Sequence, residues 1–363
     1  MNKLTLIILA GVLVGCATPQ SRMPTVDAAS SKDEARKQRE MVVEEFMSSY
    51  DRLQSVSAKI LVKSKDYCAD KVGPYYGISV WTIDEFNKDW KEAVQSKFGL
   101  TERIQVSNVS KGSVADIAGL KIGDVILSLN GWPVPVGKDA SNKLREKLHD
   151  IGKAGTPVDF LVKRGSDEMN VQIQPTQACD FSVSLSPEDV KNAYADGKKI
   201  VVYKGMMDFF KTEEELALVF SHELAHNSMK HLDAQATNAT LGALAGLVLD
   251  IAAAVGGVNT NGDFTRMGGD LGSRVYSVEF EQEADYVGLY IMANAGYEIK
   301  DAPTFWRRMA TANSNAITMK TSHPTTPERF LALESAVKEI KGKIEQGKPL
   351  RPDMKKDFSE VKK

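Results

Sequence analysis

The stretch EEELALVFSHELAHNSMKH at residues 213–231 decides how the second half of this chain folds. Thr212 precedes it and Glu215 lies three residues further on, which is the capping-box pattern that begins a helix. No Gly or Pro interrupts the stretch, so the helix is expected to continue through it. Residues four apart on a helix lie on one face, and His222 and His226 have this spacing. The pattern predicts a helix that presents two imidazoles side by side.

Two such imidazoles can bind one zinc ion, whose protein nitrogen ligands lie at about 2.0–2.1 Å. Glu223 stands beside the first histidine, where it can take a proton from a metal-bound water. A later helical run supplies Glu281 as a third ligand and, one turn further on, Asp285, which can hold a ligating imidazole in orientation. The alternative, a buried helix with two hydrogen-bonded histidines, leaves this second pair of carboxylates unexplained. We therefore expect one Zn2+ per chain.

Three further segments extend the pattern around 213–231. They are NAYADGKKIVVYKGM at 192–206, YSVEFEQEADYVGLYIMANAGY at 276–297 and SHPTTPER at 322–329. Together the four resemble the HtpX-like and CaaX-prenyl-protease family of zinc metallopeptidases, of the gluzincin type, from residue 180 to about 333. The resemblance implies these roles: zinc ligands His222, His226 and Glu281, general base Glu223, and Asp285 as the partner of a ligand, His222.

The same resemblance places the 322–329 segment close to the active site. His323 would donate a hydrogen bond to the tetrahedral intermediate, or cap the zinc as a fourth ligand in a closed, inactive state. Arg329 would stabilise an oxyanion or pair with a carboxylate, and we favour the structural pairing because arginine forms such bidentate pairs readily. The strand at 200–203 would lie along the substrate cleft. His231 is five residues past the second ligand and is expected to face away from the metal.

Residues 239–258, between the two halves of the zinc motif, are small and apolar, with Asp250 as their one charge. The length would permit a membrane helix. An Asp in mid-membrane costs about 2.5–3.5 kcal/mol, and a span here would separate the zinc ligands. We expect a buried helix or a mobile flap over the cleft, with membrane contact as the alternative.

A different domain is indicated before residue 180. The string GSVADIAGLKIGDVILSLNG at 112–131 lies among strand-like segments and closely resembles bacterial PDZ domains, over 72–176. The resemblance implies a loop that receives a peptide's terminal carboxylate on backbone N–H groups, while the peptide adds as a strand. Its residues are Tyr75, Tyr76, Gly77 and Ile78. Residues 81–99 are expected to be a helical insertion. The alternative is a spacer that binds nothing.

The first residues have the pattern of a signal peptide. An apolar run at 4–14 follows a short basic start and is too short to span a membrane. The run ends in Leu-Val-Gly-Cys16, which resembles the bacterial lipoprotein box and implies lipidation of Cys16. Several acyl chains give stable membrane anchoring. Since no Asp follows, the resemblance implies the outer membrane, facing the periplasm. The alternative is ordinary cleavage near Ala17.

The chain has three cysteines. If Cys16 is lipidated, Cys68 and Cys179 remain, and an oxidising periplasm favours their pairing. They flank the PDZ-like segment, so a disulfide between them would link the points where an inserted domain begins and ends. These two points must lie close together in an insertion. The alternative is two buried free thiols.

These observations predict an α+β fold, in which a mainly helical gluzincin-type domain with a small β-sheet is interrupted by a β-rich PDZ-like domain. The predicted parts are a signal peptide (1–15), a lipidated tether (16–31), an N-terminal helix of the protease (32–71), the PDZ-like domain (72–176), the metallopeptidase domain (177–338) and a charged tail (339–363).

The predicted function is a zinc-dependent endopeptidase of the bacterial cell envelope. It would cleave misfolded or misassembled envelope proteins, which the PDZ-like domain would recruit through C-terminal peptides. The alternative is a chaperone-like or scaffold lipoprotein with a latent zinc site. A net charge of -2 without a basic stretch argues against a nucleic-acid partner.

Overall fold

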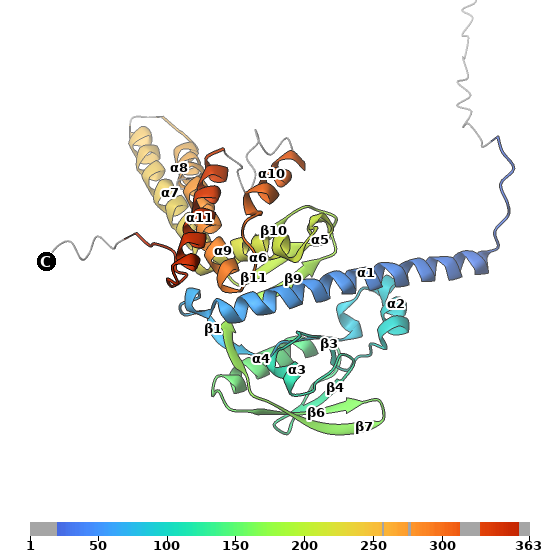
Figure 1. The fold of residues 1–363 in the computed structure, drawn as a ribbon. Coiled ribbons are helices and arrows are strands. Elements are labelled where there is room, and N and C mark those ends of the chain that lie inside the picture. The colour runs from blue at the N-terminus through green and yellow to red at the C-terminus, as the bar shows by residue number, and fades with distance from the viewer. Residues whose placement is uncertain (1–19, 256–257, 275–276, 313–326, 356–363) are drawn as a thin grey trace, which may run out of the picture.

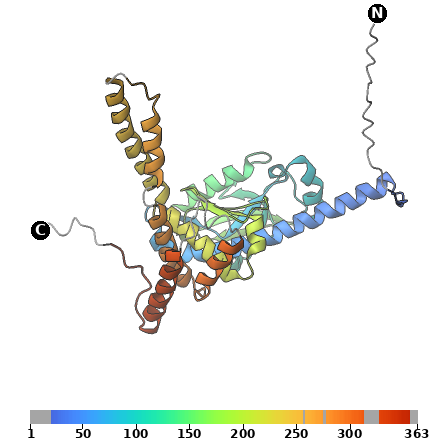
Figure 2. The ribbon, with the colours of Figure 1, turned by 90° about the horizontal axis from the view of Figure 1, so that it is seen from above.

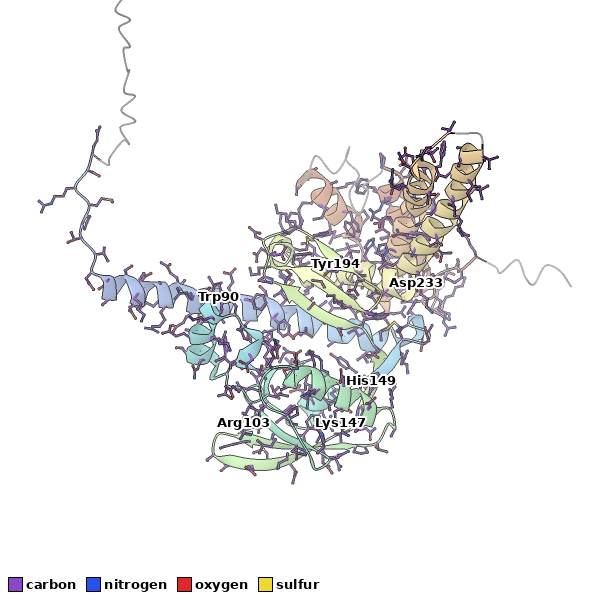
Figure 3. The ribbon with its side chains drawn as sticks, turned by 180° about the vertical axis from the view of Figure 1, so that it is seen from behind. Trp90, Arg103, Lys147, His149, Tyr194 and Asp233 are labelled. Atoms are coloured by element: carbon purple, nitrogen blue, oxygen red, sulfur yellow. A yellow bond between two sulfur atoms is a disulfide. The ribbon has the colours of Figure 1, made fainter. Side chains whose placement is uncertain are left out.

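The computed structural model describes residues 20–255, 258–274, 277–312 and 327–355, and the chain has the predicted α+β class. A long helix, α1 (Ala28–Lys63), runs between two domains, as Figures 1 and 3 show. The PDZ-like domain lies on one side of it, and the domain that carries the zinc motif lies on the other. The two domains have separate apolar cores.

Helix α1 begins earlier than residue 32, inside the segment predicted to be a tether, because the Asp27 side chain accepts a hydrogen bond from the Ser30 backbone N–H. Its buried apolar residues recur at helical spacing and contribute to the core of the second domain and to a smaller apolar cluster shared with the helical insertion at 81–99. They include Val43, Met47, Tyr50, Leu53, Val56 and Ile60. Figure 2 shows the N-terminal part of α1 extending away from the body. The helix ends before a 3-10 turn, η1 (Lys65–Tyr67).

A narrow neck joins the inserted domain to the rest of the chain. Strand β1 (Val72–Tyr75) pairs antiparallel with β8 (Thr176–Cys179), so the entry and the exit of the insertion lie side by side. Cys68 and Cys179 form a disulfide there, with a Cα–Cα distance of 5.6 Å. Both cysteines belong to the core of the second domain. The insertion therefore interrupts that domain at a closed, cross-linked position.

The PDZ-like domain is built around one antiparallel sheet in the order β2-β3-β4-β6-β7, with β5 paired to β4. Its strands are β2 (Ile78–Trp81), β3 (Gln105–Val109), β4 (Val125–Leu129), β5 (Trp132–Pro133), β6 (Val158–Arg164) and β7 (Asp167–Ile173). Its helices are η2 (Ile83–Glu85), α2 (Lys88–Phe98), α3 (Val114–Ile117) and α4 (Ala140–Gly152). The predicted helical insertion at 81–99 is confirmed by η2 and α2, and α2 packs on α1.

The second domain combines a three-stranded sheet with a cluster of helices. The sheet has the order β10-β11-β9, from β9 (Ser182–Ser186), β10 (Ala193–Ala195) and β11 (Lys199–Tyr203). The helices are α5 (Lys204–Phe209), α6 (Glu213–Ser228), α9 (Ser277–Asn294), α10 (Ala302–Ala312) and α11 (Pro327–Glu345). Helices α6 and α9 approach closely, since a Cβ on Gly288 would lie 3.1 Å from the Cα of His222. This crossing brings the two halves of the zinc motif together.

The described part of the segment 239–258 is not the predicted buried helix. Residues 239–255 lie in α7 (His231–Val255), which packs against α8 (Asp263–Arg274) in a hairpin that projects from the body, as Figures 1 and 2 show, and does not fold back over it as the predicted flap would. Most apolar side chains of α7 are exposed, because glycines rather than side chains fill the contact between the helices. Within the described parts of the chain, α7 is the one helix long and apolar enough to cross a membrane.

Candidate active site

The start of α6 is fixed by side chains as the sequence predicts. Thr212 Oγ1 accepts a hydrogen bond from the backbone N–H of Glu215 at 3.3 Å. The Glu215 carboxylate reaches back to the N–H of Lys211 at 2.6 Å and pairs with Arg308. From α1, Arg52 donates to the carbonyl of Thr212. These contacts satisfy the exposed end of the helix and orient the residues that follow.

His222, His226 and Glu281 converge as a buried cluster that could hold a metal ion. The two histidine Nε2 atoms are 3.1 Å apart, and they lie 3.5 Å and 3.3 Å from the nearer carboxylate oxygens of Glu281. Ligands about 2.0–2.1 Å from a tetrahedral zinc ion are about 3.3 Å from one another. Two nitrogens and one oxygen at these separations therefore fit zinc in both geometry and donor chemistry.

Asp285, one turn beyond Glu281, holds the other side of His222. Its Oδ1 lies 3.0 Å from His222 Nδ1. Arg329 on α11 donates to both oxygens of Asp285, at 2.8 Å from Nε and 2.9 Å from Nη2. Arg329 Nη1 is also 3.3 Å from Glu281. Of the two roles predicted for Arg329, the structure has the carboxylate pairing, and this pair orients the imidazole by a chain of contacts.

Burial and charge act in opposite directions on these groups. Burial favours neutral His222, but the carboxylates of Asp285 and Glu281 outweigh it and raise its pKa. Burial and the neighbouring His222 lower the pKa of His226. Burial alone would raise the pKa of Asp285, whereas Arg329 and His222 hold it below its ordinary value. The site therefore places two carboxylates, Glu281 and Asp285, around His222, with the Arg329 guanidinium beside both of them.

Glu223 is next to this cluster on α6 and is 3% exposed. As a general base, Glu223 must come within hydrogen-bond distance of the attacking water. Water and substrate must therefore enter this buried site for Glu223 to act. His323, the other predicted catalytic residue, lies outside the described residues. So does the predicted lipidation site, Cys16.

The structure contradicts the prediction that His231 faces away. Helix α6 ends at Ser228, and Lys230 adopts a left-handed conformation with φ of 57°, so the chain turns before α7 begins at His231. The turn returns His231 to the ligands, with its Nδ1 3.0 Å from Nδ1 of His226. The five-residue spacing misled because it assumed one continuous helix, and a left-handed lysine leaves little signal in a sequence.

The sheet edge near the cluster is fixed to α6. Residues 200–203, which were predicted to lie along the substrate cleft, belong to β11, and β11 is paired on both sides; the edge strand that contacts α6 is β10. The turn that joins β10 to β11 is held by Asn227, the residue after the second histidine. Asn227 Oδ1 accepts from the N–H of Gly197 at 2.7 Å, and its Nδ2 donates to the carbonyl of Lys199 at 3.2 Å. Figure 3 labels Tyr194, which lies on this edge strand. The edge and the cluster are thus parts of one rigid arrangement.

The predicted peptide loop is shorter than expected. Tyr75 ends β1 and pairs with Thr176, so it belongs to the neck. Tyr76 is buried, and its hydroxyl donates to the carbonyl of Leu148 on α4 at 3.1 Å. Gly77 has φ of 78°, and a Cβ there would collide with Ser113. Ile78 begins β2, the edge strand, which leaves an edge where a peptide strand can add.

Comparison with protein families agrees with both resemblances. Residues 161–337 match the model of Peptidase family M48, and residues 74–174 match that of the PDZ domain. The predicted resemblances of the two parts of the chain, to a metallopeptidase family and to PDZ domains, are therefore confirmed.

Curated relatives match over parts of their length. Mitochondrial metalloendopeptidase OMA1 of Arabidopsis thaliana is 30% identical over 163 residues, which are 44% of this chain and 32% of the relative. The putative beta-barrel assembly-enhancing protease of Vibrio cholerae is 34% identical over 150 residues, 38% of this chain and 31% of the relative. The beta-barrel assembly-enhancing protease of Escherichia coli O157:H7 is 28% identical over 189 residues, which are 49% of this chain and 37% of the relative. The chain spans about a third of the length of each relative.

Proposed function

We propose that this chain, whose residues 161–337 belong to peptidase family M48, is a zinc metalloendopeptidase of the bacterial cell envelope that cleaves misfolded or misassembled envelope proteins. The observation that carries the proposal is the buried cluster of His222, His226 and Glu281 beside Glu223. The three would hold the metal, and the donor separations of 3.1–3.5 Å fit zinc without rearrangement.

Zinc bound there would supply Lewis-acid polarisation of the scissile carbonyl. The chain itself supplies the proton transfers and the positioning. Glu223 takes a proton from the attacking water and returns it to the leaving amine nitrogen. Asp285 and Arg329 keep His222 in orientation, and the edge of β10 binds the substrate backbone as an added strand. This arrangement suits an extended, unfolded segment of a protein.

The PDZ-like domain would recruit the substrates. Its edge strand β2 and the turn at Gly77 support binding of a C-terminal or extended peptide. The N-terminal sequence pattern supports lipidation at Cys16 and an outer-membrane location facing the periplasm. The Cys68–Cys179 disulfide suits that oxidising compartment. Two relatives named beta-barrel assembly-enhancing proteases support envelope proteins as the substrate class.

The test uses a soluble form that lacks residues 1–16, with zinc content and casein cleavage measured for the wild type and for Glu223→Gln. We expect about one zinc per chain in both proteins, since Glu223 is not a ligand. Cleavage by the variant should fall by about 10²–10⁴-fold, the usual contribution of a general base. Wild-type protein that binds no zinc would exclude a zinc peptidase. Equal cleavage by both proteins would remove Glu223 from the mechanism.

A further inference from the structure

His231 is a buried side chain that the mechanism above does not use. It is 2% exposed and lies between the second histidine ligand and helix α9. Its Nδ1 is 3.0 Å from Nδ1 of His226, and its Nε2 is 2.9 Å from Oε2 of Glu283. Its ring stacks on Phe280, with the centroids 4.8 Å apart and the planes at 24°. Both ring nitrogens and one ring face therefore have defined partners.

The chemistry of the three groups fixes the direction of the hydrogen bonds. An ionised carboxylate only accepts, so Glu283 requires a proton on Nε2 of His231. A neutral imidazole then has a lone pair on Nδ1, which accepts the Nδ1–H of His226. That tautomer leaves the lone pair of His226 on Nε2. This is the atom that faces His222 and Glu281 in the metal cluster, at 3.1 Å and 3.3 Å.

We propose that His231 and Glu283 are a positioning pair that sets the tautomer and the ring orientation of His226. The inference rests on the proposed zinc function of that residue. It gives the second ligand a counterpart to the Asp285–Arg329 pair behind the first. Such outer partners typically change metal affinity or activity by about 10- to 100-fold when they are removed.

The local fold explains how the pair forms. The left-handed Lys230 reverses the chain directly after α6, so the first residue of α7 returns to the ligand helix. Glu283 lies on α9 between Glu281 and Asp285, so one helix supplies a metal-ligand candidate, the partner of His222 and the partner of His231. The Glu283 side chain is 42% exposed, and its replacement therefore disturbs little packing.

Three variants separate positioning from packing. His231→Phe keeps a ring against Phe280 but removes the acceptor for His226. His231→Asn keeps an acceptor, because its Oδ1 can take the place of Nδ1. Glu283→Leu removes the acceptor for the Nε2–H of His231, so that no group holds the proton on that nitrogen.

The experiment measures the zinc dissociation constant of each protein by chelator competition, and the thermal melting of each after chelation. The wild type is titrated first, because its failure to bind zinc would defeat the proposed function and not this inference. We expect about 10- to 100-fold weaker zinc binding for His231→Phe and Glu283→Leu. His231→Asn should bind within a few-fold of the wild type.

The inference would be overturned if His231→Phe bound zinc as tightly as the wild type. It would also be overturned if His231→Asn bound zinc no more tightly than His231→Phe. If His231→Phe does not fold, Glu283→Leu decides, since the Glu283 side chain is 42% exposed and its replacement disturbs little packing. Wild-type affinity in that variant would then overturn the inference, and weakened affinity with unchanged melting would support it.

Discussion

Two consecutive helices, α6 and α7, distribute their polar and apolar residues in opposite ways. Helix α6 buries His222, Glu223 and Asn227 together with its apolar residues. Helix α7 buries His231, Gly246 and Asp250 and exposes its leucines and valines. In α6 the polar groups can be buried because partners surround them. In α7 the apolar side chains face outward because α8 approaches too closely to leave them room. Apolar content therefore does not decide which face of a helix is buried.

The hairpin of α7 and α8 is held together by close contact between the two helix backbones and by the carboxylate of Asp250. A Cβ on Gly242 would collide with the carbonyl oxygen of Gly268, and one on Gly246 with that of Phe264. Such small-residue contacts let two helices pack through their backbones. Asp250 accepts hydrogen bonds from the N–H and hydroxyl of Thr265, at 2.8 Å and 2.6 Å. Hydrogen bonds from Thr260 and Thr265 lower the pKa of Asp250 to about 2. The one charge between residues 239 and 258 is thus satisfied within the hairpin.

The largest effect is expected where the buried polar network of α6 and α9 is broken. Arg329→Met leaves Asp285 buried without its guanidinium, and loss of one partner of a buried pair costs about 3–5 kcal/mol. Chemical denaturation measures the free energy of unfolding. The matched control is Arg307→Met, which removes the exposed pair with Glu334 and should cost about 0–1 kcal/mol. Equal effects of the two variants would show that the network near the metal cluster contributes no special stability.

The neck should show the next largest effect, because its disulfide belongs to the same core as α6. Cys68→Ala with Cys179→Ala removes a cross-link that spans a sequence separation of 111 residues. Loss of such a constraint typically costs about 2–5 kcal/mol. Denaturation of the wild type with and without reductant, beside the double variant, measures it. A wild type whose stability does not respond to reductant would mean that the two thiols are not bridged in solution.

The hairpin can be opened without disturbing the body. Gly246→Ala places a methyl group against the Phe264 carbonyl, and such overpacking typically costs about 1–3 kcal/mol. Hydrogen exchange of α7 and α8 amides should accelerate, while zinc content and exchange in α6 stay unchanged. The control is Gly269→Ala, whose Cβ would meet its nearest atom at 3.6 Å and should be neutral or stabilising. Faster exchange in α6 as well would mean that the hairpin and the zinc region unfold together.

Short-range spacing explains why most of the metal cluster could be predicted. The i, i+4 pairs His222–His226 and Glu281–Asp285 each lie on one helix, so geometry within a turn places them. Their meeting in space depends on the crossing of α6 and α9 at Gly288, which periodicity within either helix does not give. Glu281 was placed there by the need of zinc for a third ligand and by family resemblance. The same resemblance placed Asp285 next to His222, and the general tendency of arginine to form bidentate pairs favoured a carboxylate partner for Arg329.

The features that were missed depend on chain reversals and on facing surfaces. A left-handed Lys230 brings His231 back to His226, and no residue pattern marks that turn. Residues 239–258 were expected to be buried because they are apolar, whereas the glycines at 242 and 246 match those of a partner helix 20 or more residues later. The pairing of α7 with α8 is made at single glycines. The periodicity of apolar residues within one helix cannot predict such a contact with another helix.

The smallest effect is expected on the outer face of α7. Val248 is 65% exposed, so Val248→Gln should change the free energy of unfolding by no more than about 0.5 kcal/mol, as surface substitutions usually do. The same change at Leu218, which is buried on α6, should cost several kcal/mol because it places an amide in the core. Denaturation of both variants and of the wild type at low and at high protein concentration tests the contrast. A loss of more than about 1 kcal/mol at Val248 exceeds what an exposed side chain contributes. It would mean that this face of the hairpin is covered in solution. The apolar side chains of α6 and α7 would then differ less in burial than they do in one isolated chain.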